Sequence, residues 1–158
     1  WQGDRIGPIG WGKPMPRITR SALVMFSAEQ MFRLVNDVHA YPEFLPGCVG
    51  SRVHETGEDY MMASVDVAKA GIAKTFTTRN QLDTNRRIKM ELVEGPFSKL
   101  AGWWTFPPLD VDACKVEFDL DFEFTSKLIE LAFGQIFREL VSSMVLAFSN
   151  RAKVVYGV

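Results

Sequence analysis

The chain has 158 residues, of which 47% are hydrophobic and 23% charged, and its formal net charge at pH 7 is −1. A chain of this length makes one domain with one core, and its near-neutral charge excludes a general attraction to DNA. Residues 1–16 combine glycine and proline without periodicity, so we expect a flexible leader or cloning remnant there and a single domain over 17–158. The chain has no long uninterrupted apolar run and no secretion-signal pattern, which predicts a cytoplasmic protein.

The first third of the chain predicts a strand followed by two short helices. Residues 17–26 alternate loosely between apolar and polar, as in a strand. The sequence Ser-Ala-Glu-Gln at 27–30 fits a capping box, in which Ser27 and Gln30 satisfy backbone N–H groups, and predicts a helix that ends near Asn36. Segment 41–48 reads Tyr-Pro-Glu-Phe-Leu-Pro-Gly-Cys, and its two prolines permit only a short helical turn.

The middle of the chain predicts six more strands joined by short turns. Short connections imply antiparallel pairing and a curved sheet, which has seven strands when the first is included. We expect these strands over residues 49–56, 60–68, 73–82, 87–93, 99–109 and 115–124, and Pro107-Pro108 marks the end of the one over 99–109. In the last one, apolar residues alternate strictly with charged ones, so one face is buried and the other is solvated.

The charged face of that last strand carries Glu117, Asp119, Asp121 and Glu123. Successive residues on one face of a strand lie ~6.6–6.8 Å apart, so these carboxylates do not converge on one metal ion. We interpret them as a solvated face that forms salt bridges to neighbouring strands, with basic partners among Arg79, Lys74 and Lys89.

Residues 125–156 predict one long amphipathic helix. Apolar residues recur at steps of three and four, which places them on one face. A stripe this long needs a broad apolar partner, and only the sheet supplies one. We therefore predict an α+β helix-grip fold, in which the sheet wraps around a helix whose apolar face is Ile129, Ala132, Phe133, Ile136, Phe137, Leu140, Met144, Ala147 and Phe148.

Catalytic and metal-binding patterns are weak. His39 and His54 belong to no ligand spacing, Cys48 and Cys114 read as buried reduced thiols, and no nucleophile elbow occurs. We therefore assign no catalytic residue, no metal site and no required cofactor. An acid/base pair assembled in space remains an alternative, because such a pair needs no sequence motif.

The aromatic and methionine content poses the main functional question. Twelve Phe, seven Met and four Trp either fill a solid core or line a cavity between sheet and helix. In the cavity hypothesis Tyr41, Trp104, Thr78 and Asn80 supply the few polar groups. Its floor would be Val65, Val67, Phe76, Met90, Leu92, Trp104, Phe106, Phe118, Leu120 and Phe122, its roof Phe133, Ile136, Phe137, Leu140 and Met144, and its mouth Tyr41, Phe44, Leu45 and Phe97.

The chain resembles the coenzyme Q-binding START-like family of the polyketide cyclase/dehydrase-like (START/Bet v 1-like) superfamily, and within it the bacterial branch. The resemblance extends from about Ile18 to Tyr156 and includes the order of elements. It implies the helix-grip fold and a tunnel for hydrophobic ligands, with Pro42, Pro46, Gly95 and Pro96 as structural positions; which of Trp103 and Trp104 faces inward stays open. Its motifs are Tyr41-Pro-x-Phe44-Leu-Pro46-x-Cys48, Gly95-Pro-Phe97-x-x-Leu100-x-x-x-Trp104-x-Phe106 and Phe118-x-Leu120-x-Phe122-x-Phe124.

The resemblance implies two functions, and the residues themselves separate neither. Mitochondrial relatives imply a non-enzymatic protein that binds ubiquinone or a similar prenyl lipid and supports respiration, with transient membrane contact at the inner membrane. The bacterial branch implies binding to the large ribosomal subunit that blocks its association with the small one. Arg86, Arg87 and Lys89 form the basic cluster suited to RNA. We take the lipid carrier as the first hypothesis, the ribosomal protein as the second, and a cyclase- or hydrolase-like enzyme as the third.

Overall fold

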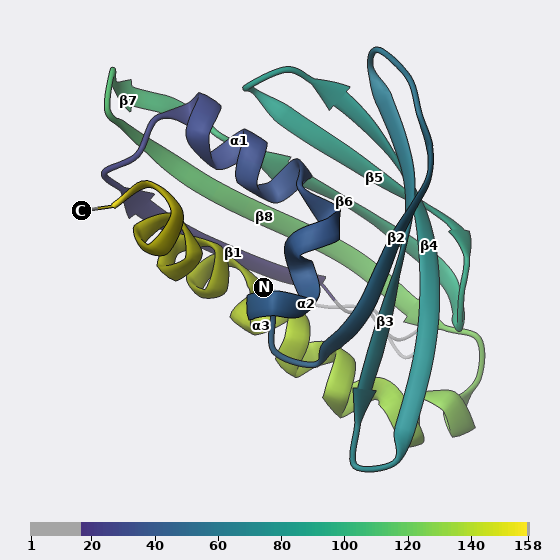
Figure 1. Cartoon of the computed structure of the whole chain (residues 1–158). Helices are drawn as coiled ribbons and strands as arrows, with labels where there is room; N and C mark the ends of the chain where they lie inside the picture. The colour runs from purple at the N-terminus through teal and green to yellow at the C-terminus, as the bar shows by residue number, and fades with distance from the viewer. Residues whose placement is uncertain (1–16, 158) are drawn as a thin grey trace, which may run out of the picture.

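A curved antiparallel sheet wraps around one long helix (Figure 1). The computed structural model describes residues 17–157, so the predicted leader 1–16 lies outside the described residues. Along the sheet the strands follow the order β1-β8-β6-β5-β4-β3-β2, with β7 beside β8. Their bounds are β1 Arg17–Val24, β2 Cys48–Thr56, β3 Tyr60–Lys69, β4 Ile72–Asp83, β5 Arg87–Glu94, β6 Phe97–Thr105, β7 Pro108–Asp110 and β8 Ala113–Phe124.

The two predicted short helices follow β1. Helix α1 (Ala28–Asn36) begins at the predicted capping box, in which the Gln30 backbone N–H donates to the Ser27 hydroxyl at 3.1 Å and the Ser27 N–H donates to the Gln30 side chain at 2.9 Å. A 3₁₀ turn, η2 (Val38–Ala40), leads into α2 (Tyr41–Phe44), which holds Pro42 in its first turn. Gly47 then reverses the chain with a φ of +84°, a conformation that glycine adopts without strain.

The single strand predicted over 99–109, with its end at Pro107-Pro108, is divided into two strands in the structure. β6 stops at Thr105, and residues 108–110 form the separate short strand β7, which pairs with the start of β8. Pro107 has no N–H to donate, so the β6 ladder cannot continue through it. The Pro107 carbonyl instead accepts from the Lys115 N–H at 3.0 Å, which turns the chain into the β7–β8 hairpin.

The long helix α3 (Lys127–Tyr156) lies against the concave face of the sheet (Figure 1). Ser126 caps its start by accepting from the Ile129 N–H at 3.1 Å. Its buried face is rotated from the prediction, because Val141 and Val145 are buried whereas Ala132 is exposed. By length and composition α3 also qualifies as a membrane-spanning helix, but its buried Phe and Val side chains pack on the sheet, as in the core helix of a globular domain.

The carboxylates of β8 lie on the outer face of the sheet, as predicted, but their basic partner was misassigned. The Arg17 guanidinium on β1 binds Asp119 with an Nε–Oδ1 distance of 2.9 Å and approaches Asp121 at 3.8 Å. Hydrogen bonding from Arg17 lowers the pKa of Asp119 below its ordinary value. β1 and β8 are paired neighbours in the sheet, whereas Lys74, Lys89 and Arg79 lie on strands farther away.

The core consists of two aromatic groups joined by aliphatic side chains. At one end Trp104 stacks on Phe118 with 4.3 Å between ring centroids and meets Phe148 of α3 edge-on at 5.3 Å. At the other end Phe137 of α3 contacts a set of rings whose centroids lie 4.8–6.1 Å away, namely Phe76, Phe97, Phe122, Phe124 and Phe133. A cavity lies between the two groups.

Candidate functional site

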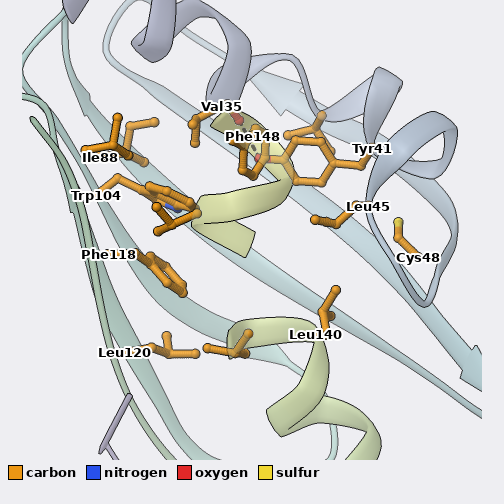
Figure 2. Close-up of a cluster of buried hydrophobic side chains, with 14 of the residues drawn as sticks. Val35, Tyr41, Leu45, Cys48, Ile88, Trp104, Phe118, Leu120, Leu140 and Phe148 are labelled. Carbon is orange, nitrogen blue, oxygen red and sulfur yellow. Dashed lines mark hydrogen bonds between the residues drawn. The ribbon is translucent and has the colours of Figure 1, made fainter. Parts of the chain in front are cut away.

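The cavity encloses about 60 Å³ between the concave face of the sheet and α3. Figure 2 shows Trp104, Phe118 and Leu120 projecting from the sheet toward Leu140 of α3, with Tyr41 and Leu45 closing the far side. Predicted residues that line it are Tyr41, Leu45, Val65, Phe76, Met90, Trp104, Phe118, Leu120, Phe137, Leu140 and Met144, together with the predicted polar pair Thr78 and Asn80.

Other predicted site residues lie off the cavity. Phe97, Phe122 and Phe133 pack into the Phe137 group, and Phe106 packs beside Trp104 against Phe32 of α1. Alternation along a strand shows which face of the sheet a residue occupies, but not how far along the strand the cavity lies. Inward-facing core residues therefore could not be distinguished from cavity-lining residues in the sequence. The remaining ones off the cavity are Phe44, Val67, Leu92 and Ile136.

Phe44 lies in a separate shallow groove between α2 and α3. There it contacts the Phe148 ring at 5.1 Å and lies 5.1 Å from the Arg151 guanidinium, so it braces α2 against α3. Arg151 also binds Glu43 at 3.0 Å. Of the four residues predicted at the mouth of the cavity, only Tyr41 and Leu45 line it.

Four lining residues were missed by the sequence analysis: Val38, Ala63, Leu100 and Val141. Ala63 and Leu100 share the inward face of their strands with predicted residues, so strict alternation was a usable signal for them. Val141 follows Leu140 in the sequence. The predicted apolar face of the helix included Leu140 and Met144 but not Val141, so Val141 was left out of the predicted lining. Val38 lies on the η2 turn, where no periodic pattern marks it.

Two N–H donors in the cavity lining have no acceptor. The Thr78 hydroxyl donates to Asn80 Oδ1 at 2.9 Å, but among the described residues nothing accepts from the Asn80 amide nitrogen. Trp104 is only 1% exposed, and among the described residues no acceptor lies within hydrogen-bond distance of its indole N–H on the cavity side. Outside the cavity, Arg151 Nε is a fully buried nitrogen without a partner. Buried Trp N–H groups usually find a partner, so the lining offers two donors to a guest molecule.

The predicted polar role of Tyr41 changes, since its hydroxyl donates to the backbone carbonyl of Val35, drawn as a dashed line in Figure 2. Burial raises the pKa of Tyr41, so this hydroxyl stays protonated. The described lining contains no carboxylate, histidine, lysine or arginine. The site thus presents apolar surface and hydrogen-bond donors to a neutral molecule.

In the conformation seen here, the cavity is too small for most small-molecule ligands. About 60 Å³ has room for a few waters, whereas small-molecule pockets usually measure ~300–1,000 Å³. A prenyl chain therefore requires displacement of lining side chains. Met90 and Met144 are suited to this displacement, because unbranched thioether side chains repack at low cost.

Trp103 and Trp104 have opposite environments, which answers the question left open by the sequence. Trp104 faces the cavity, whereas Trp103 is 38% exposed on the outer face of the sheet. Both cysteines are buried free thiols, as predicted, and burial raises the pKa of Cys114 to about 11. Within residues 17–157 no group of His, Cys, Asp and Glu is arranged to hold a metal ion.

The fold and the cavity together define a helix-grip protein with an apolar interior site. The chain belongs to the polyketide cyclase/dehydrase and lipid transport family, whose model matches residues 24–149. It is 64% identical over 143 residues to the ribosome association toxin RatA of Escherichia coli K12, covering 90% of each chain. It is 29% identical to the mitochondrial coenzyme Q-binding protein COQ10 homolog B of Xenopus laevis, covering 88% of this chain and 59% of that one.

The fold is shared with solved structures at low sequence identity. The Zhui aromatase/cyclase from Streptomyces sp. R1128 superposes with a TM-score of 0.79 at 19% identity, covering 90% of this chain and 98% of that one. At this identity the likeness shows the helix-grip fold, and the predicted fold class is confirmed.

Proposed function

We propose that this protein acts on ribosomes by binding the large subunit and preventing its association with the small one. The observation that carries the proposal is the 64% identity, over 90% of both chains, to a protein named as a ribosome association toxin. The similarity to the coenzyme Q-binding protein is much lower. This contrast reverses the order in which the sequence alone ranked the two hypotheses. We propose a cytoplasmic location as well, because ribosomes are the proposed target.

Subunit joining measured by light scattering tests this proposal. Purified small and large subunits are mixed at a magnesium concentration that favours joining, with and without the protein added to the large subunits first. The proposal predicts a smaller rise in scattering in proportion to the added protein. An unchanged rise at a molar excess of folded protein contradicts it.

We further propose that the cavity binds a neutral, mainly apolar molecule that carries a hydrogen-bond acceptor, such as a prenylated quinone. The unpaired donors of Asn80 and Trp104 support this class, because a quinone carbonyl accepts hydrogen bonds. Since the lining supplies no acid or base suited to proton transfer, the proposal includes no covalent change to the ligand.

Extraction of the native protein tests the second proposal. Organic solvent should release a quinone or related lipid that mass spectrometry identifies. Titration of the emptied protein with a short-chain ubiquinone should then give saturable binding. Empty extracts together with no binding of the added quinone contradict the proposal, whatever the outcome of the ribosome assay.

A further inference from the structure

A row of side chains crosses the outer face of the sheet on four neighbouring strands. The register places Tyr60 of β3 opposite Gln81 of β4, Gln81 opposite Lys89 of β5, and Lys89 opposite Trp103 of β6. Each points away from the core, since the residues beside them, such as Met61, Ile88 and Trp104, are buried. Neighbouring strands lie ~4.8 Å apart, so Tyr60 and Trp103 stand roughly 14 Å apart.

Each aromatic ring of this row has at least one cation beside it, and the Tyr60 hydroxyl donates to the Glu55 carboxylate. The Arg79 guanidinium lies 4.1 Å from the ring centroid of Tyr60. Arg87 and Lys89 lie 5.5 and 5.4 Å from the ring centroid of Trp103. Arg86, at the turn between β4 and β5, adds a guanidinium whose side chain is 80% exposed. The row therefore combines two separated ring surfaces with four positive charges.

The nearby carboxylates hold these cations loosely. Asp83 lies 3.3 Å from Arg87 and 3.9 Å from Arg86, and Lys89 lies 3.7 Å from Glu91. Exposed pairs with such distances contribute little, so phosphate oxygens compete with them for the same cations. Beside Tyr60 is a hollow of about 210 Å³ lined by Asp59, Tyr60, Arg79, Gln81 and Glu91.

We propose that this row is a binding platform for single-stranded RNA, with bases on Tyr60 and Trp103 and phosphates on the adjacent cations. The inference rests on the proposed function, for which it names the contact surface. Sheets that present aromatic side chains stack unpaired bases, and interleaved Arg and Lys follow the backbone. Gln81 and the carboxylates of Asp59 and Glu91 in the hollow can form hydrogen bonds with the edges of bases, which carry donors and acceptors. The acidic outer face of β8 limits the platform to β3–β6.

Binding of the full chain to purified large ribosomal subunits tests the platform. We expect Trp103→Ala and Tyr60→Ala each to weaken binding by about tenfold or more, because each removes a stacking surface. Trp103→Phe keeps a ring and should retain most of the affinity. Circular dichroism and thermal unfolding establish that each variant is folded, as expected for changes on the solvated face of the sheet.

A double charge variant with a matched control distinguishes specific phosphate contacts on the platform from a general effect of the protein's charge on binding. Arg87→Gln with Lys89→Gln should lower the slope of log affinity against log salt by about 1.4, since each lost phosphate contact removes ~0.7. Arg33→Gln with Lys115→Gln removes the same charge on α1 and β8 and should leave that slope unchanged. Equal losses in the two double variants contradict the platform.

Ultraviolet cross-linking identifies the class of molecule that the row contacts. Irradiated complexes should yield peptides containing Trp103 or Tyr60 with an attached nucleotide. Adducts to ribosomal proteins alone overturn the inference, as does unchanged binding of both alanine variants, and the proposed function then stands without it. If the unmodified chain does not bind large subunits, the proposed function fails and the platform fails with it.

Discussion

Trp103 and Trp104 are adjacent in β6 and serve opposite faces of the sheet. Trp104 is 1% exposed and stacks on Phe118 across the cavity wall, whereas Trp103 is 38% exposed and lies beside Arg87 and Lys89. One strand thus contributes to the interior site and to the outer platform. Substitutions at these two positions should therefore separate the proposed ligand binding from the proposed ribosome binding.

Trp104→Phe should weaken quinone binding up to about tenfold, because it removes an unpaired donor while keeping an aromatic ring in the stack. Inhibition of subunit joining should be unchanged. Fluorescence titration with a short-chain ubiquinone measures the first quantity and light scattering the second. Trp103→Phe is the matched control, and equal quinone affinity in the two variants would refute the role of the Trp104 N–H.

Phe137→Ala should reduce the free energy of unfolding by ~3–5 kcal/mol. The Phe137 ring is 1% exposed and contacts the rings of Phe76, Phe97, Phe122, Phe124 and Phe133, so truncation leaves a cavity that rigid neighbours cannot fill. Urea denaturation measures the loss. Ile136→Ala, at a half-buried position, is the control and should cost less; a loss under ~1 kcal/mol for Phe137→Ala would mean that the group is loosely packed.

The Arg52–Asp66 pair should stabilise the fold fully above about pH 4 and progressively less as the pH falls toward 2. Two hydrogen bonds from Arg52 at 2.8 and 2.9 Å, with one from Thr75 at 2.6 Å, lower the pKa of Asp66 to about 2 from an ordinary value of 3.8. A lowered native pKa gives stability that is present above the unfolded pKa and is lost as the pH falls toward 2.

The corresponding measurement compares the chain with its Arg52→Gln variant by urea denaturation at several pH values. The difference in unfolding free energy should be small near pH 7, because Arg52 is 49% exposed and solvent screens the pair, and it should shrink between pH 4 and 2. A difference that stays constant over this interval would show that Asp66 is not the titrating partner.

Gly95→Ala should destabilise the protein more than Gly71→Ala. Gly95 has a φ of +156°, and a Cβ there would lie 2.8 Å from the Phe76 Cβ and 3.2 Å from its Cα. Gly71 has a φ of +81° but faces open space, so its substitution adds only backbone strain of about 1–2 kcal/mol. Thermal unfolding of the two variants compares the costs, and equal costs would show that Phe76 yields to the added methyl group.

Local patterns in the sequence account for much of the fold. Ser27 and Gln30 predicted the start of α1, and the alternation along β8 predicted which of its side chains are buried. Patterns that depend on tertiary packing were harder to predict. The rotation of α3, which buries Val141 and Val145, depends on how the sheet curves around a helix whose apolar residues cover more than one face.

The sequence predicted an apolar cavity between the sheet and the long helix, but it did not predict which inward residues line the cavity or how large it is. Alternation identified inward residues such as Phe118 and Phe122, yet only Phe118 lines the cavity, because position along the groove depends on sheet twist. The volume depends on the rotamers of large side chains, which no periodicity encodes. The pairing of Arg17 with Asp119 likewise depends on the strand order, which brings the first and last strands together.

Sucrose-gradient sedimentation tests the central claim, action on the large ribosomal subunit, most directly. The protein is incubated with equimolar small and large subunits under joining conditions, and each fraction is assayed for the protein and for both subunits. The account predicts that the protein comigrates with free large subunits while the joined-ribosome peak falls. A full joined-ribosome peak, with the protein remaining at the top of the gradient, would contradict it.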